Sequence, residues 1–267
     1  TTPAGSAGTA HDEAVEICRN LIRIDTSNYG RGESKGERRA AEYVAGLLEE
    51  VGLAATMVES APGRTSVFAR MEGTDPSADA LLVHGHLDVV PAVAEDWSVD
   101  PFAAEIRDGM IWGRGAVDMK DMDAMILSVV RHMVRTGQKP KRDIMLGFFA
   151  DEEAGMEYGS KWVVRNHPEL FEGVTDAISE VGGYSANIGG RRAYLLQTAE
   201  KGLMWMRLFA DGTAGHGSQV NTDNPVTRLS RAMANIGEYQ WPIELTKTTR
   251  QFLDSVTELT GVEFDPQ

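Results

Sequence analysis

A histidine and carboxylate cluster stands at the end of a short apolar run. The run begins with Leu81 and ends in His84-Gly85-His86-Leu87-Asp88, which predicts a buried strand that presents polar side chains at its end. Alternate residues of an extended segment point to the same side, so His86 and Asp88 form a pair. The imidazole can bind a metal ion while the carboxylate holds its other ring N–H. His84 shares that side, and spacing alone does not exclude it as the ligand.

A further carboxylate, Asp118, follows the glycine-rich turn at residues 113–115 and directly precedes an apolar helical pattern. Its short side chain has two oxygens, and it can therefore bridge two metal ions about 3.5–4 Å apart, as two-metal hydrolases require.

Three consecutive acids, Asp151, Glu152 and Glu153, follow the all-apolar run at residues 144–150. Such a triplet is usually a solvated loop. Open α/β sheets, however, bind ligands at the carboxyl ends of their strands, so these acids are expected near the histidine cluster. Two neighbouring glutamates can point in different directions, which lets one coordinate a cation while the other moves protons.

Glu180 is a further acid at the end of a predicted strand, because it ends another short apolar strand pattern at residues 177–180. Gathering several carboxylates at one sheet edge is very costly without a cation, so we expect a bound metal. A ligand set of imidazole and carboxylate without thiolate suits zinc, with cobalt or manganese as substitutes.

Five short motifs follow one another along the chain: HGHLDVVP, GRGAVDMK, ADEEAG, SEVGG and GHGS. They resemble, in the same order, the motifs of the dinuclear zinc aminoacylases and peptidases. This family includes carboxypeptidase G, aminoacylase, acetylornithine deacetylase and succinyl-diaminopimelate desuccinylase. The resemblance runs from about residue 11 to the end of the chain, and five ordered motifs are far more specific than one.

The resemblance implies a role for each cluster residue. His86 and Glu180 would hold one zinc, Asp118 would bridge two zinc ions, and Glu153 would hold the second. Glu152 would be the general acid and base. The implied reaction is hydrolysis of the amide bond of N-acyl amino acids or small peptides by a metal-bridging hydroxide.

His216, in the GHGS motif, is flanked by glycines and has little to pack against, which favours function over core packing. The resemblance implies that it reaches across a homodimer into the partner's active site and stabilises the oxyanion of the tetrahedral intermediate. The alternative is a surface loop without such a role. Asn221 and Asn224, just beyond, are candidates for substrate binding.

The family also has a last histidine ligand from its C-terminal part, which this chain lacks. The other histidines, His11, His132 and His167, lie in predicted helices or at a helix end and are interpreted as surface or packing residues. We therefore expect the chain to be the N-terminal portion of a longer polypeptide and to be inactive by itself.

The expected fold is α/β, with a mixed, largely parallel sheet flanked by helices and part of a smaller α+β lid and dimerisation domain. Helical and strand patterns alternate along the chain, which favours this class. We expect a flexible tail over residues 1–10, a metal-binding catalytic domain over 11–202 and an incomplete lid over 203–267.

Composition narrows the class of protein. The 267 residues are 42% apolar and 25% charged, which is typical of soluble globular domains. A net charge of −14 argues against nucleic acid as a partner. No run of about 18 apolar residues is present, so no membrane span is expected. The single cysteine, Cys18, lies at a core position, which excludes an internal disulfide framework and predicts a cytoplasmic location.

Two other functions compete with hydrolysis. A family member that has lost its chemistry would be a non-catalytic binding or dimerisation module, although every site residue that this portion could carry is present. A nucleotide-binding sheet is disfavoured, because neither GxGxxG nor a Walker sequence follows the first strand.

Overall fold

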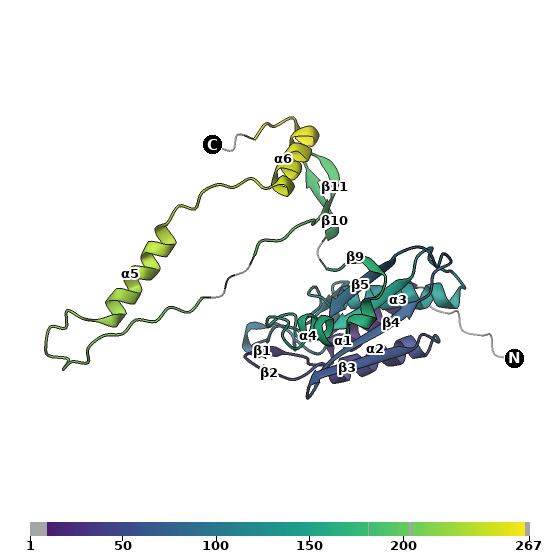
Figure 1. The fold of residues 1–267 in the computed structure, drawn as a ribbon, viewed down its shortest axis with the longest axis horizontal. Coiled ribbons are helices and arrows are strands. Elements are labelled where there is room, and N and C mark those ends of the chain that lie inside the picture. The colour runs from purple at the N-terminus through teal and green to yellow at the C-terminus, as the bar shows by residue number, and fades with distance from the viewer. Residues whose placement is uncertain (1–9, 181, 203, 205, 265–267) are drawn as a thin grey trace. The chain divides into compact units, whose positions relative to one another are not determined.

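The structure is a computed structural model that describes residues 10–180, 182–202, 204 and 206–264. The chain forms two compact units, which meet in sequence between residues 180 and 181 (Figure 1). Of the predicted tail, residues 1–9 lie outside the described residues, and Ala10 begins the first helix. The predicted domain division at residue 202 stays a prediction.

A five-stranded mixed sheet forms the centre of the first unit. Its first half is antiparallel, since β4 pairs antiparallel with both β3 and β8, whereas β5 runs parallel to β8 and β9. The α/β class with a mixed sheet is thus confirmed, and the parallel pairing is confined to the half that carries the site. In order across the sheet, the strands are β3 (Ala55–Ala61), β4 (Arg64–Met71), β8 (Ile144–Phe149), β5 (Ala80–His86) and β9 (Val174–Ile178).

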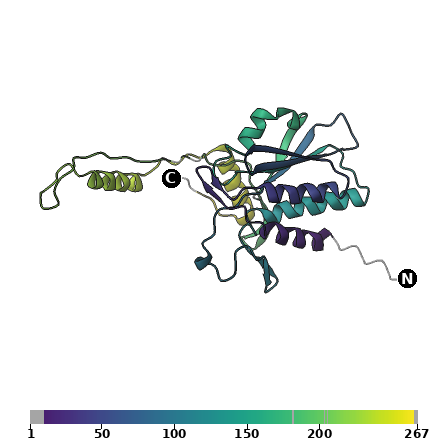
Figure 2. The same ribbon diagram turned by 90° about the horizontal axis from the view of Figure 1, so that it is seen from below.

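Helices cover both faces of this sheet, which explains why β8 is apolar throughout. Leu146 and Phe148 pack into the core beneath α2 and α3, whereas Met145 and Phe149 join the smaller cluster beneath α4. Figure 2 shows α2, in blue-purple, and α3, in teal, on one side of the sheet. Alternate residues of β8 therefore enter two different cores. The helices are α1 (Ala10–Ile22), α2 (Arg38–Glu49), α3 (Lys120–Arg135) and α4 (Ser160–Asn166).

Short elements complete the first unit, and a hairpin with two helices makes up the second. In the first unit they are β1 (Asn28–Gly30), β2 (Glu33–Ser34), η1 (Ala94–Asp96), β6 (Glu105–Arg107), β7 (Met110–Trp112) and η2 (Pro168–Phe171). In the second they are β10 (Gly182–Ile188), β11 (Arg191–Leu196), α5 (Pro225–Glu238) and α6 (Lys247–Thr260).

Cys18 is buried on α1 among the apolar core residues, in agreement with its predicted packing role. Burial raises the pKa of its thiol to about 12, so the thiolate is disfavoured at neutral pH. Among the residues that the structure describes, every helix is too short or too polar to span a bilayer.

Gly85 gives a test of how tightly β5 packs on the start of α3. A Cβ added at Gly85 would overlap Oδ1 of Asp123 and lie 2.8 Å from Cε of Met119. We expect Gly85→Ala to lower the free energy of unfolding by about 1–3 kcal/mol, because the packed neighbours must shift. Urea unfolding of the purified variant measures the change.

Gly46, in the middle of α2, is the matched control. A Cβ there meets no atom within 4 Å, and alanine stabilises a helix interior by roughly 0.5–1 kcal/mol relative to glycine. The two glycine-to-alanine changes should therefore move stability in opposite directions, and a Gly85→Ala protein as stable as wild type or more stable would contradict the packing described for Gly85.

Candidate metal centre

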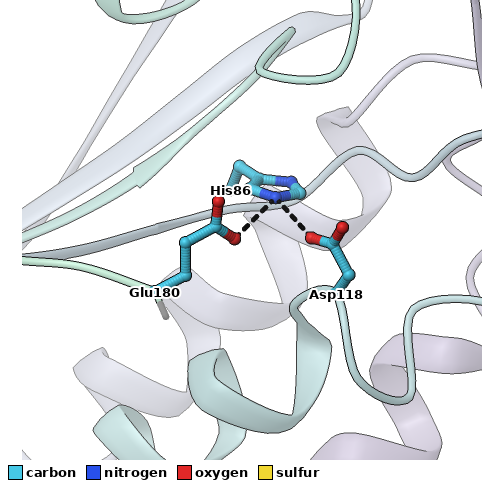
Figure 3. Close-up of side chains that lie close together, drawn as sticks. All are labelled: His86, Asp118 and Glu180. Atoms are coloured by element: carbon cyan, nitrogen blue, oxygen red, sulfur yellow. Dashed lines mark hydrogen bonds and ion pairs between the residues drawn. The ribbon is translucent and has the colours of Figure 1, made fainter. Parts of the chain in front are cut away.

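Three segments that are distant in sequence bring a histidine and two carboxylates together. His86 is the last residue of β5, Asp118 lies in the loop before α3, and Glu180 follows the end of β9. Because β5 and β9 are parallel, their carboxyl ends lie at the same edge of the sheet. Figure 3 shows the three side chains pointing toward one another.

The distances are short enough for a shared ion. Nε2 of His86 is 3.1 Å from Oδ1 of Asp118 and 3.3 Å from Oε2 of Glu180. One possible ligand atom from each residue lies within 4.8 Å of the others. The His86 side chain is only 3% exposed, whereas that of Asp118 is 65% exposed. A buried nitrogen therefore faces carboxylates on an open side, as in metal sites that also bind substrate.

The second ring nitrogen of His86 is held by Asp88. Nδ1 lies 2.9 Å from the main-chain carbonyl oxygen of Asp88 and 3.5 Å from its carboxylate Oδ1. The main-chain oxygen is thus the nearer acceptor, although the pairing argument pointed to the carboxylate. An Nδ1–H that donates to Asp88 leaves the Nε2 lone pair directed at Asp118 and Glu180, which fits a divalent ion such as zinc.

The charge around His86 also fits a cation. Burial by itself would lower the pKa of His86, but its hydrogen bonds to Asp118, Asp88 and Glu180 raise that pKa well above the ordinary value. The carboxylates thus favour a positive charge at this point. A proton on the imidazole supplies that charge in the metal-free protein, and a metal ion on Nε2 would supply it instead.

The acid loop, defined here as residues 151–159, follows β8 and is tied to the histidine by Asp88. The main-chain N–H groups of Glu152 and Glu153 donate to the Asp88 carboxylate at 3.0 and 3.2 Å. Oε2 of Glu152 then lies 3.8 Å from Nε2 of His86. Burial, together with the neighbouring Glu180 carboxylate, raises the pKa of Glu152, so this carboxylate takes up a proton more readily than a solvated glutamate does.

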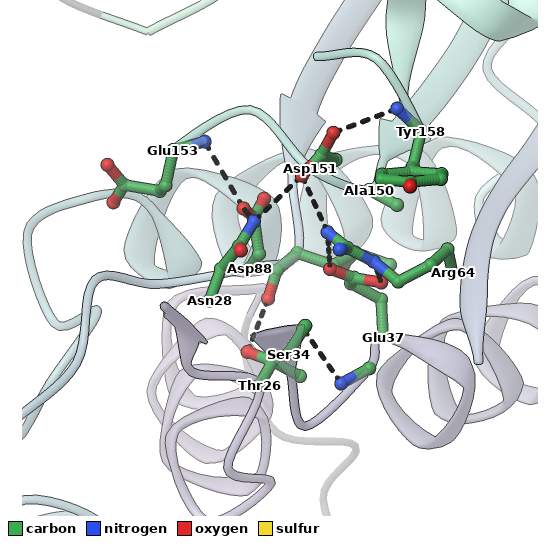
Figure 4. Close-up of polar contacts among 12 residues, drawn as sticks. Thr26, Asn28, Ser34, Glu37, Arg64, Asp88, Ala150, Asp151, Glu153 and Tyr158 are labelled. Atoms are coloured by element: carbon green, nitrogen blue, oxygen red, sulfur yellow. Dashed lines mark hydrogen bonds and ion pairs between the residues drawn. The ribbon is translucent and has the colours of Figure 1, made fainter. Parts of the chain in front are cut away.

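The Glu153 carboxylate lies outside the His86, Asp118 and Glu180 group. Figure 4 shows it pointing away from the contacts that Asp88 makes with the acid loop. Burial, followed by the nearby Asp118 carboxylate, raises the pKa of Glu153 to about 7. The assignment of Glu153 as the ligand of a second ion stays a prediction.

The raised pKa of Glu153 predicts how the stability of the metal-free protein depends on pH. The folded carboxyl titrates near 7 and the unfolded one near its model value of 4.5, so the folded state binds more protons between these values. Stability contributed by this group is present below pH 4.5 and declines as pH rises through about 7. We expect Glu153→Gln to remove that decline. Thermal melts of chelator-treated protein from pH 5 to 8 measure it, and an unchanged pH profile in the variant would contradict it.

His84 does not join the metal cluster. Its ring is nearly perpendicular to that of Phe149, with the ring centroids 5.6 Å apart, and burial lowers the pKa of His84. Packing against β8 accounts for this side chain, and among the described residues His86 is the histidine in the cluster.

The predicted residues of the second unit have local partners. Nδ1 of His216 lies 2.8 Å from Oγ of Ser218, and the placement of His216 in a partner's active site stays a prediction. The side-chain oxygen of Asn224 caps α5 by accepting a hydrogen bond from the main chain at 2.9 Å. Asn221 donates to the carbonyl oxygen of Thr213. Capping gives Asn224 a structural role.

A buried polar network beside the cluster was not predicted from the sequence (Figure 4). Asn28 of β1 donates to both Asp88 and Asp151, while Arg64 of β4 donates to Asp151 and, through two nitrogens, to Glu37. We call these five residues the Asn28 network. They come from five separate segments, and no local pattern in the chain connects them.

Comparison with known proteins identifies the family. The model of peptidase family M20/M25/M40 matches residues 82–260, which is more than half of the chain. The chain belongs to this family.

Two curated relatives match most of this chain. Aminoacylase-1 of Sus scrofa is 31% identical over 228 residues, covering 84% of this chain and 53% of the relative. The N-fatty-acyl-amino acid synthase/hydrolase PM20D1 of Xenopus tropicalis is 27% identical over 240 residues, covering 86% of this chain and 46% of that protein. This M20 chain therefore spans about half the length of the curated relatives it matches.

A solved structure shares the M20 fold. The di-peptidase Dug1p from Saccharomyces cerevisiae superimposes with a TM-score of 0.62 at 18% identity, covering 96% of this chain and 60% of that one. The fold predicted from the five motifs is thereby confirmed as that of an M20 peptidase.

Proposed function

We propose that the protein is a metal-dependent hydrolase that cleaves the amide bond of N-acyl amino acids or small peptides. The observation that carries this proposal is the convergence of Nε2 of His86 with the Asp118 and Glu180 carboxylates, beside the partly exposed Glu152. The names of the relatives, an aminoacylase, an N-fatty-acyl-amino acid hydrolase and a dipeptidase, support the substrate class.

Each side chain has a part in the proposed reaction. His86, Asp118 and Glu180 would hold one zinc ion, and Asp118 and Glu153 would hold a second, with cobalt or manganese as substitutes. Bound divalent ions would lower the pKa of water and polarise the substrate carbonyl. Glu152 accepts the proton from the attacking water and then delivers it to the leaving amine. Asp88 keeps the His86 imidazole oriented.

The proposal also includes a homodimer and a cytoplasmic location. His216 would stabilise the developing oxyanion from the partner subunit of a homodimer. The motif order that the chain shares with its family supports this role. The single buried cysteine supports a cytoplasmic location, because disulfides form and persist mainly in oxidising compartments outside the cytosol.

A hydrolysis screen tests the proposed function. The complete protein, loaded with zinc, is assayed against a panel of N-acyl amino acids and dipeptides, with chelator-treated protein as the control. We expect amine release that depends on the metal. A protein that binds zinc but releases no amine from any member of the panel would instead be a binding module.

A further inference from the structure

The Asp88 carboxylate does more than hold His86, because it also fixes the backbone of the acid loop. The side chain is completely buried, and its carboxylate accepts the main-chain N–H groups of Glu152 and Glu153 at 3.0 and 3.2 Å. Its Oδ1 also lies 3.5 Å from Nδ1 of His86. The carboxylate therefore sets the position of Glu152 and Glu153 relative to the histidine.

The Asn28 side chain connects the Asp88 carboxylate to the Asp151 carboxylate through hydrogen bonds. Its Nδ2 lies 2.8 Å from Oδ2 of Asp88 and 2.9 Å from Oδ1 of Asp151, and its own Oδ1 accepts the main-chain N–H of Gly30 at 3.1 Å. Both amide hydrogens and the amide oxygen thus have partners. A neutral double donor between two buried carboxylates satisfies each of them without adding charge.

Asp151 is itself a fixed point of the acid loop. Its backbone has a φ of 61°, in the left-handed region, and its side chain accepts hydrogen bonds from Arg64 at 2.8 Å and from the main-chain N–H of Tyr158 at 2.8 Å. Arg64 is buried and held by two 2.9 Å bonds to Glu37. The Asp151 charge is therefore compensated by Arg64, whereas the Asp88 carboxylate faces His86 and accepts hydrogen bonds from Asn28 and from two main-chain N–H groups.

We propose that Asn28 is a positioning residue for the acid loop. By holding Asp88 and Asp151 at a fixed separation, its amide sets where the main chain places Glu152 and Glu153. This inference rests on the proposed function for the roles of those two glutamates. It concerns a residue of β1, whose contact with Asp151 spans 123 positions of the chain.

Two substitutions at Asn28 test the proposal in the complete protein. Asn28→Asp keeps the shape of the side chain but replaces the two donors by a third carboxylate. Asn28→Ser retains a hydroxyl that can donate to one carboxylate but not to both. Thr26→Val is the matched control, because Thr26 is equally buried and donates to the main-chain oxygen of Leu87 at 2.6 Å without touching the acid loop.

We expect kcat and the affinity for added Co²⁺ to fall about 10–100-fold in Asn28→Asp, the usual effect of losing a residue that orients metal ligands. Asn28→Ser should lie between this variant and wild type. KM should change little, because Asn28 would not touch the substrate. The Co²⁺ absorption spectrum should change in both Asn28 variants but not in Thr26→Val.

Two results would overturn the proposal. The first is that Asn28→Ser, and Asn28→Asp if it folds, keep kcat and Co²⁺ affinity within about twofold of wild type. Such a change would be far smaller than the roughly 10–100-fold loss that is usual for a residue that orients metal ligands. The other is an equal loss in Thr26→Val. The Co²⁺ titration needs no substrate, so it decides the role of Asn28 even if the hydrolysis screen fails and the proposed substrate class is wrong.

Discussion

Glu152→Ala should reduce kcat by about 10²–10⁴-fold, the usual contribution of a positioned general acid or base, while metal content stays at the wild-type level. The Glu152 carboxylate lies outside the group formed by His86, Asp118 and Glu180, so its loss should not release an ion held there. Its Oε2 lies 3.8 Å from Nε2 of His86, beside the proposed metal ligands, where the proposed reaction needs a proton acceptor. Steady-state kinetics and elemental analysis of the same preparation measure the two quantities.

Glu157→Ala is the matched control for this prediction. Glu157 belongs to the same acid loop but is exposed and pairs with Lys161 at 2.9 Å. We expect its kcat to be that of wild type. Near-normal hydrolysis by Glu152→Ala would show that another group accepts the proton.

Asp118→Ala should lose both metal and activity. Its Oδ1 is 3.1 Å from Nε2 of His86, and hydrogen bonding to His86 lowers the pKa of Asp118, so the carboxylate is ionised and ready to coordinate at neutral pH. As a proposed bridge it would contact both ions. We therefore expect metal affinity to fall by more than the roughly 10–100-fold typical of losing a residue that only orients a ligand. Competition against a zinc-binding dye measures the affinity.

Asp96→Ala serves as the comparison for a general effect of removing negative charge. Asp96 is an exposed carboxylate of η1 and is absent from the metal cluster. Its variant should bind zinc as wild type does. An Asp118→Ala protein that kept full zinc affinity would contradict the proposed ligand set.

The position of the cluster could be predicted because it depends on local signals. An apolar run that ends in polar residues marks the end of a buried strand, and parallel strands place such ends at one edge. His86 and Glu180 follow this rule, and the structure brings them to within 3.3 Å. Boundaries were less accurate: β9 ends at Ile178, so Glu180 lies beyond the strand rather than in it. Strand propensity changes little over two residues and does not define an end.

The Asn28 network could not be predicted in this way. Its members are single polar residues, and the contact between Arg64 and Asp151 joins positions 87 residues apart. Neither periodicity nor a motif marks them, because their burial becomes visible only when β1, β4 and the acid loop are folded together. Asn28 itself stands in the polar stretch Asp25-Thr26-Ser27-Asn28, and a short polar stretch of this kind gives no sign of a fully hydrogen-bonded, buried side chain.

The position of β9 at the border of the sheet has a kinetic consequence for Glu180. Among the described residues β9 pairs with β5 alone, and four of its five residues are exposed. Its amide protons should therefore exchange with solvent faster than those of β5, since strands with few buried contacts open locally at low free energy. Each opening would carry Glu180 away from His86. The residence time of a bound ion would then be set by fraying of this strand, well before the domain as a whole unfolds.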